Sequence, residues 1–544
     1  MHLTKSFVPR GVRYPAPDVA RGFMLLLIAL ANVSVWAATV RSGSPGSAAD
    51  TAWIWVRTLL VTSRAYPLFA MLFGFGLTVM INRRIASGTR AHLQRLGAAG
   101  AGREPTPAEE AWAREQATVD ARRLVRRRGL WMILFGFVHG IFFYGDIIGT
   151  YGLAAVVFAG WLARNHRKRA LAVCVLLTLI LIWTQLNAGG AAAIMGTTYA
   201  QAVAQEQVRA EGLSVFFSNV QRWTAQSVTI LGVASTIVPA MFIGARLADT
   251  DVMADPRKHR GPLVAVAVGG LVIGAASAVG MARWIAGGRL MAWDPVVDEV
   301  FGLAGACGWL ALLTLCAGGP APDGRLTGLR RLASSVGRRS MTGYLSQTIL
   351  FATVFVIVPR LLGTHLVVGE AASAGIAVVV WLAAVVLCAV LERGGHAGPF
   401  EALLRTAVAR TERRRRLPAP PAPQPVRLGR HVGAEPALRG DEDQRPQQHE
   451  QPEGERRGLL EDLRVLPGRL DRRGDDGEVL RRDDLAQAAA GQVLTTHDRE
   501  EAGADPTATA PRLHDIAEGG DGHMRVSPGR VLAKEKEQPK KPVE

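Results

Sequence analysis

Long apolar runs constrain this chain more than any other feature of its sequence. Ten such runs lie within residues 1–411, and residues 412–544 contain none. A helix of about 20 apolar residues rises about 30 Å, which matches the hydrocarbon thickness of a bilayer. The predicted fold is therefore an all-α, polytopic membrane helix bundle with about ten transmembrane helices. The runs lie near residues 23–40, 65–82, 129–144, 147–163, 170–186, 225–247, 262–286, 296–317, 341–362 and 371–391.

Charge divides the chain at the same place. Residues 1–411 hold 39 basic and 20 acidic residues, whereas residues 412–544 hold 24 basic and 26 acidic ones. Basic loops between apolar runs are what membrane topology selects for, so we assign the net charge of +17 to topology and not to nucleic-acid binding. The lipid bilayer is the expected partner, and nucleic acid is not.

The basic residues also predict the orientation of the spans. They gather in the second, fourth, sixth and eighth loops, at 83–128, 164–169, 246–260 and 325–339. Because cytoplasmic loops carry the excess of Lys and Arg, both termini are predicted to be cytoplasmic. The first run is taken as a retained helix, since its 18 residues exceed the roughly 7–15 of a signal-peptide h-region. A cleaved signal peptide is the less favoured alternative.

Two domains are expected, a transmembrane domain over 1–411 and a cytoplasmic tail over 412–544. No aromatic residue follows Phe400, so the tail lacks the apolar surface needed to offset its ordering entropy. We predict that the tail is disordered, and its Arg-, Ala-, Gly- and Pro-rich composition also fits a non-native extension of the reading frame. In the second loop, residues 107–128 are expected to be helical, either lying on the inner leaflet or only setting topology.

The cysteines predict no metal site and no disulfide scaffold. Each lies alone inside an apolar run, where it is expected to pack as a small hydrophobe: Cys174, Cys307, Cys316 and Cys388. The sequence also lacks a Walker motif and a GxSxG elbow, so no cofactor is evident from its motifs.

Polar side chains inside the spans carry the functional signal, because an ionisable or amide group in hydrocarbon is costly and usually faces the bundle interior. Asp18 and Arg21 stand at the cytoplasmic entrance of the first run. Asn32 lies three helical turns beyond Arg21 on the same face. Arg21 and Asn32 are therefore predicted to line one polar track that enters from the cytoplasm.

A second group of polar residues opens the ninth run. Arg338 is expected at the cytoplasmic interface, with Tyr344 and Gln347 one turn apart inside the membrane. Two interpretations stay open for these side chains, which either line the same cavity or brace neighbouring helices. Bracing is the favoured interpretation for Gln347.

His139 and Asp146 form the candidate catalytic pair. Asp146 follows His139 by seven residues, which places both on one helical face if the helix continues between them. A carboxylate beside an imidazole fixes its tautomer and raises its basicity, which prepares a general base. The alternative is that His139 only bonds a neighbouring helix. The predicted topology puts the pair toward the outer side of the membrane.

Four segments, in order, resemble the YeiB-like family of bacterial membrane proteins, domain of unknown function 418. They are DVARGFMLLLIALANV at 18–33, YPLFAMLFGFGL at 66–77, GFVHGIFFYGDIIGTYGL at 136–153 and VGRRSMTGYLSQT at 336–348. The resemblance extends over about 18–405 and implies a multi-pass protein of the bacterial cell membrane.

That resemblance also implies a distant similarity to transmembrane acyltransferases, which modify sugars and envelope polymers. Arg21 and Gly22 match the pattern of those enzymes, but Asn32 stands where they carry a His. His139 with Asp146 is then the comparable base. Two functions remain as hypotheses. The first is acyl transfer from a cytoplasmic donor to an envelope acceptor, with acyl coenzyme A as co-substrate. The second is transport of a small molecule or a lipid-linked substrate, with the same residues lining its path.

Overall fold

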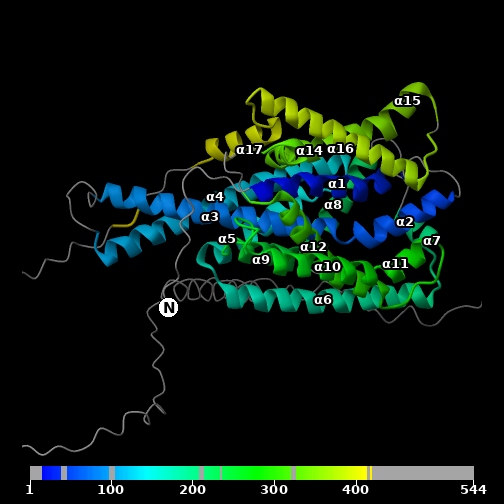
Figure 1. Ribbon diagram of the computed structural model, residues 1–544, viewed down its shortest axis with the longest axis horizontal. Helices are drawn as coiled ribbons and strands as arrows, with labels where there is room; N and C mark the ends of the chain where they lie inside the picture. The colour runs from blue at the N-terminus through cyan, green and yellow to red at the C-terminus, as the bar shows by residue number, and fades with distance from the viewer. Residues whose placement is uncertain are drawn as a thin grey trace, which may run out of the picture. The chain divides into compact units, whose positions relative to one another are not determined.

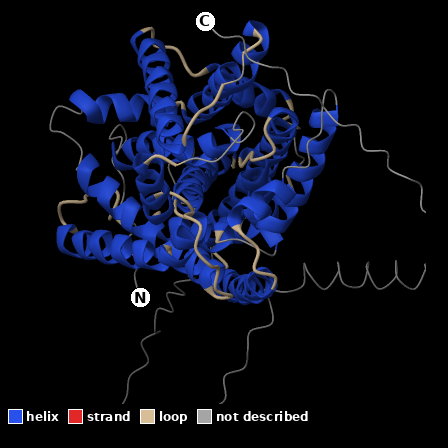
Figure 2. Ribbon diagram, turned by 90° about the vertical axis from the view of Figure 1, so that its right-hand side faces the viewer, coloured by secondary structure: helices blue, strands red, loops and turns tan. Residues whose placement is uncertain are grey.

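Every regular element in the described part of the chain is a helix, as the sequence predicts (Figures 1 and 2). The computed structural model describes residues 15–37, 46–96, 105–206, 214–232, 236–319, 326–364, 366–412 and 417–419. These residues all belong to one compact unit. The predicted disorder of the tail falls on residues that lie almost entirely outside the described ranges.

The helices differ widely in length. The longer ones are α1 (Pro15–Ala37), α3 (Ala65–Arg95), α4 (Pro107–Phe142), α5 (Ile148–Arg164), α6 (Arg167–Ile194), α8 (Ser214–Gly232), α10 (Arg260–Ser277), α12 (Asp294–Ala317) and α16 (Glu370–Arg393). The shorter ones are α2 (Ala48–Leu60), α7 (Tyr199–Glu206), α9 (Ile237–Leu247), α11 (Val279–Ile285), α13 (Gly328–Arg338), α14 (Ser340–Ala352), α15 (Val358–Leu362) and α17 (Pro399–Arg410). A π-helical segment, η1 (Thr353–Ile357), joins α14 to α15.

The apolar runs coincide with these helices. Within the described ranges, 7 helical segments are long and apolar enough to cross a membrane, and α5 and α9 are shorter apolar helices. The run at 129–144 forms the end of α4, and the run at 225–247 is shared by α8 and α9. The chain is therefore a helical membrane protein, while the number of about ten crossings stays a prediction.

Local signals explain where α4 begins. Thr106 and Glu109 form a capping box, in which each side chain accepts a hydrogen bond from the other residue's backbone N–H, and Pro107 occupies the first turn. The helix then runs without a break to Phe142, so residues 107–128 are helical as predicted and form one helix with the run at 129–144. Together with α3, this part of α4 projects past the other helices at the left of Figure 1.

Glycines let several helices cross at backbone contact. A Cβ on Gly74 of α3 would overlap the carbonyl of Met241, and a Cβ on Gly244 of α9 would overlap the carbonyl of Met71. Small residues at such crossings allow the van der Waals packing that drives helix association in membranes. The reciprocal overlap fixes α3 against α9.

The N-terminus of α14 is held by a carboxylate from α17. Glu401 Oε1 accepts hydrogen bonds from the backbone N–H groups of Met341 and Thr342, at 2.7 and 3.0 Å. These are two of the donors that every helix N-terminus leaves unpaired. The contact orients α14, which carries Tyr344 and Gln347 into the bundle.

Candidate functional site

His139 and Asp146 are in direct contact. His139 Nδ1 lies 2.7 Å from Asp146 Oδ1, and both side chains are buried. The helix does not continue between them, because α4 ends at Phe142 and the Asp146 N–H donates to the carbonyl of Phe143. Phe143 stacks on Trp36 of α1, with ring centroids 5.3 Å apart, which anchors this turn. The pair forms through a turn in the chain and not through helical periodicity.

Asp146 is fixed on its second oxygen as well. Asp146 Oδ2 accepts hydrogen bonds from the Gly149 N–H at 2.8 Å and from Trp223 Nε1 of α8 at 3.1 Å. Gly140 and Gly149 leave the space that the Trp223 ring occupies. Because a carboxylate accepts hydrogen bonds, His139 Nδ1 is the protonated nitrogen, and Nε2 is left to accept.

Thr348 completes this arrangement from α14. His139 Nε2 lies 2.9 Å from Thr348 Oγ1, so an acid, an imidazole and a hydroxyl follow one another in hydrogen-bond contact. Sequence reasoning missed Thr348. Its position one turn beyond Tyr344 was the available signal, since residues four apart share a helix face.

Tyr344 lies against the imidazole. Its ring meets that of His139 edge to face, with centroids 5.3 Å apart, and its side chain is buried. No group of the described residues meets the Tyr344 hydroxyl in hydrogen-bonding geometry. The Asn32 side chain and the Ile147 backbone lie near enough to act on this hydroxyl electrostatically. A buried hydroxyl therefore lies beside the His139 pair, with Asn32 and Ile147 as its polar neighbours.

The remaining predicted site residues lie elsewhere. Gln347 Nε2 donates to the Leu25 carbonyl at 3.2 Å and joins α14 to α1, which is a bracing contact. Arg21 donates to the carbonyl of Leu72 and lies 3.6 Å from Asp18. These contacts of Arg21 lie on α1 and α3.

Arg338 also lies apart from the His139 pair. Its guanidinium forms an ion pair with Glu392 of α16, with 2.6 Å between Nη2 and Oε1. Glu392 is held by Arg339 as well, at 3.4 Å. Arg338 therefore joins α13 to the end of α16.

A second buried polar cluster joins α3 to α12. Arg64 is 1% exposed, and its Nη1 lies 2.5 Å from Asp298 Oδ1, while Ser63 Oγ donates to Asp298 Oδ2 at 2.9 Å. Arg64 Nη2 donates to the Gly274 carbonyl and to Ser277 Oγ on α10. Sequence reasoning missed this cluster, although charged residues at the edges of two apolar runs were visible.

The two clusters adjoin. Tyr66 donates a hydrogen bond to Glu299, which follows Asp298 on α12. The buried Tyr151 hydroxyl of α5 donates to the Tyr66 backbone carbonyl at 2.9 Å. Tyr151 lies close enough to Asp146 for that carboxylate to act on it electrostatically. Polar groups, among them the half-buried Tyr66, thus lie between the His139 site and Arg64.

The family comparison covers only part of these residues. Residues 247–411 match the model of a family described as a protein of unknown function (DUF418). The matched segment holds Asp298, Tyr344 and Thr348, whereas His139 and Asp146 precede it. No curated protein and no solved structure matches the chain. In the described ranges, no three His, Cys, Asp or Glu side chains are placed to hold a metal ion.

Proposed function

We propose that this membrane protein of the DUF418 family, whose function is unknown, transfers an acyl group to a hydroxyl acceptor. The proposal rests on the chemistry of the His139 site. The observation that carries this proposal is the ordered contact of Asp146, His139 and Thr348, with 2.7 and 2.9 Å between successive partners. Nucleophile and base within about 2.6–3.2 Å, with the base oriented by a third group, are the signature of nucleophilic catalysis, of which acyl transfer is one form.

Thr348 is the nucleophile in this proposal. His139 Nε2 takes the proton from Thr348 Oγ1 as that oxygen attacks the carbonyl carbon of an acyl thioester. The bond between carbon and sulfur breaks, and the thiolate leaves with the proton from His139. In the second step His139 takes a proton from an acceptor hydroxyl, whose oxygen attacks the threonine ester, and the Thr348 oxygen regains a proton. Asp146 stabilises the imidazolium in both steps.

Tyr344 and Asn32 supply the polar surroundings of this reaction. The negative charge that develops on the carbonyl oxygen needs hydrogen-bond donors that are already in place. The Tyr344 hydroxyl is buried beside His139 with the Asn32 side chain close to it, which suits the two groups to this role. Acyl coenzyme A is the proposed donor, and an envelope sugar or polymer in a bacterial cell membrane is the proposed acceptor.

The test uses the full chain in phospholipid vesicles, with a series of acyl coenzyme A thioesters as probes. Thiol release and the mass of the peptide containing Thr348 are measured for the wild type, His139→Gln and Asp146→Asn. Loss of a general base lowers the rate about 10²–10⁴-fold, so His139→Gln should release almost no thiol. Asp146→Asn should retain an intermediate rate.

His92→Gln is the matched control. His92 Nε2 lies 3.2 Å from Asp120 Oδ2 where α3 packs on α4, so this variant also removes a buried His from a His–Asp pair. It should retain the wild-type rate. Acyl transfer is excluded if no thioester is turned over by the wild type, or if His139→Gln at equal abundance is as active as the wild type.

Thr348 is tested by two substitutions of similar size. Thr348→Ser keeps the hydroxyl and should still accumulate the acyl ester, whereas Thr348→Val should abolish both the ester and thiol release. A Thr348→Val protein that transfers acyl groups at the wild-type rate would show that the acceptor attacks the thioester directly.

Transport is the second candidate, and the Arg64 cluster favours it. Charged residues inside membrane proteins mark ion and substrate pathways as well as catalytic sites. Hydrogen bonds join Glu299 to Tyr66 and Tyr66 to Tyr151, which lies near Asp146, and this series of polar groups is the path that transport would use. Acidification inside reconstituted vesicles that depends on Glu299 and not on Thr348 would support transport over acyl transfer.

A further inference from the structure

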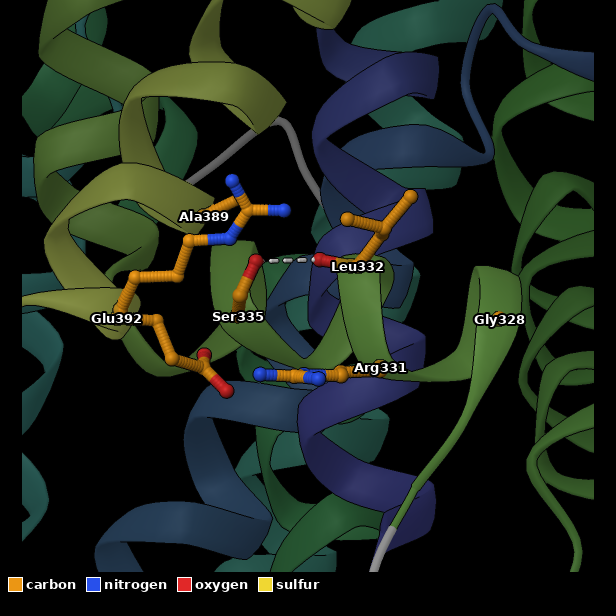
Figure 3. Close-up of a pocket in the computed structure, with 7 residues that line it drawn as sticks. Gly328, Arg331, Leu332, Ser335, Ala389 and Glu392 are labelled. Atoms are coloured by element: carbon orange, nitrogen blue, oxygen red, sulfur yellow. Dashed lines mark hydrogen bonds between the residues drawn. The ribbon is translucent and has the colours of Figure 1, made fainter.

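A cavity of about 240 Å³ lies between α13 and α16, away from the His139 site (Figure 3). Its walls come from the exposed side of α13 and the last turn of α16. The lining residues are Gly328, Arg331, Leu332, Ser335, Ala389, Glu392 and Arg393. Figure 3 shows the Arg331 and Glu392 side chains reaching toward each other across it.

The cavity carries an excess of positive charge. Glu392 is the carboxylate in its wall, and this group is already paired with Arg338 and Arg339. Arg331 and Arg393 are exposed, and no carboxylate of the described residues forms an ion pair with either. Two guanidinium groups therefore line the cavity beside a single carboxylate that two other arginines already hold, and such groups bind phosphate oxygens in bidentate fashion.

An apolar stripe on α16 leads into the same cavity. Val386, Ala389, Val390 and Arg393 follow at intervals of three and four residues, so they share one helix face. Val386 and Val390 are 62% and 58% exposed, as expected of side chains that face lipid tails. The stripe continues along the helix through Leu382 and Val379, which are exposed as well. A ligand with a phosphate at one end and hydrocarbon at the other fits this combination.

We propose that this cavity binds the headgroup phosphate of an anionic phospholipid, with Arg331 and Arg393 as its ligands and the acyl chains along the α16 stripe. A free phosphate compound offers the same chemistry to the arginines, but it makes no use of the apolar stripe. The predicted topology places this end of α16 at the cytoplasmic leaflet, where anionic lipids attract basic residues. The site does not depend on the acyl-transfer proposal.

The experiment measures the melting temperature of the full chain in a neutral detergent against increasing ligand concentration. The probes are dioctanoyl phosphatidylglycerol, dioctanoyl phosphatidylcholine and glycerol phosphate. Phosphatidylglycerol should bind about 10-fold or more tightly than either of the others, because only it joins net negative charge to acyl chains. Equal binding of the two lipids overturns the proposal, and so does glycerol phosphate binding as tightly as phosphatidylglycerol.

Two kinds of variant locate the binding. Arg331→Gln combined with Arg393→Gln should weaken phosphatidylglycerol binding about 10-fold or more, since it removes two charge-assisted contacts. Arg410→Gln changes an exposed arginine of α17 outside the lining and should bind as the wild type does.

Ala389→Leu fills the cavity without changing charge and should weaken binding as well, which provides a second test if the arginine variant folds poorly. Unchanged binding in either folded variant places the lipid elsewhere and overturns the proposal.

Discussion

The stability of this bundle is expected to be most sensitive to substitution of its buried charged residues. Arg64 is buried by α3, α10 and α12, where Asp298, the Gly274 carbonyl and Ser277 Oγ all accept its N–H groups. Removing one member of a buried ion pair leaves an uncompensated charge, which costs far more than removing both. Arg64 is therefore expected to be essential only while Asp298 is present.

Arg64→Met should lower the free energy of unfolding by about 3–5 kcal/mol, because it leaves the Asp298 carboxylate buried without its partner. Arg64→Met combined with Asp298→Leu should recover most of that loss. Unfolding of the detergent-solubilised variants with increasing denaturant measures both. A double variant as unstable as Arg64→Met alone would show that the hydrogen bonds of Arg64 to α10, and not the ion pair, hold the cluster.

At the scale of helices, backbone contact at glycines sets how α3 and α9 cross. Gly244→Ala places a methyl group against the Met71 carbonyl, where neither helix has a flexible side chain to move. Overpacking of this kind costs about 1–3 kcal/mol, so the variant should unfold more readily than the wild type. The free energy of unfolding in mixed detergent measures the loss.

Gly269→Ala on α10 is the matched control for that substitution. A Cβ at this position meets nothing within 4 Å, so the change only improves helix propensity and should be neutral or slightly stabilising. Equal losses in the two alanine variants would mean that helix crossing at Gly244 contributes nothing to stability.

Sequence patterns predicted helices better than the contacts between them. Hydropathy located apolar helices, and the spacing of His139 and Asp146 correctly suggested a contact, although the turn at Phe143 produces it. Arg64 and Asp298 stand 234 positions apart. Periodicity reports which residues share a face of one helix and contains no information on which helices adjoin. Contacts such as Arg64 to Asp298, or His139 to Thr348, arise only from the packing of separate helices.

At the scale of the whole molecule, the helical domain should be independent of the residues after Glu412. A chain that ends after Glu412 keeps Glu401 on the N-terminus of α14 and should melt at the wild-type temperature. A chain that ends after Gly398 loses α17 and these charge-assisted hydrogen bonds, which contribute about 1.5–3 kcal/mol each when buried. It should therefore melt lower. Thermal unfolding of both truncated chains checks this, and a clear loss in the longer one would show that the tail stabilises the domain.

Contacts among the basic loops bear on the topology of the whole chain. Arg164 pairs with Glu115 at 2.7 Å, and Arg167 pairs with Asp249 at 3.3 Å, so the second, fourth and sixth basic loops lie at one end of the bundle. Glu412 lies 3.4 Å from Arg127, which brings the end of α17 to the same loop as Glu115.

The start of α1 lies beside the eighth loop. A Cβ on Gly337 of α13 would overlap the carbonyl of Asp18, and α13 is joined to the end of α16 by the pair of Arg338 with Glu392. The end of α17 therefore lies on the side of the basic loops, and α16 ends where α1 begins. One group of contacts joins the second, fourth and sixth loops to the end of α17, and the other joins the start of α1 to α13 and α16. If both groups lie on one side of the membrane, the chain crosses it an even number of times.

A reporter fused after Glu412 tests that conclusion. Because the basic residues gather in the loops that meet at this end, the positive-inside rule predicts that the fused reporter is cytoplasmic. A fluorescent protein that folds only in the cytoplasm should be bright there, and a phosphatase that is active only after export should be silent.

A second pair of fusions, after Gly287 between α11 and α12, should give the opposite result, because α12 crosses once between that loop and α13. Phosphatase activity at Glu412 would contradict the predicted topology, and equal results at the two positions would contradict the crossing by α12.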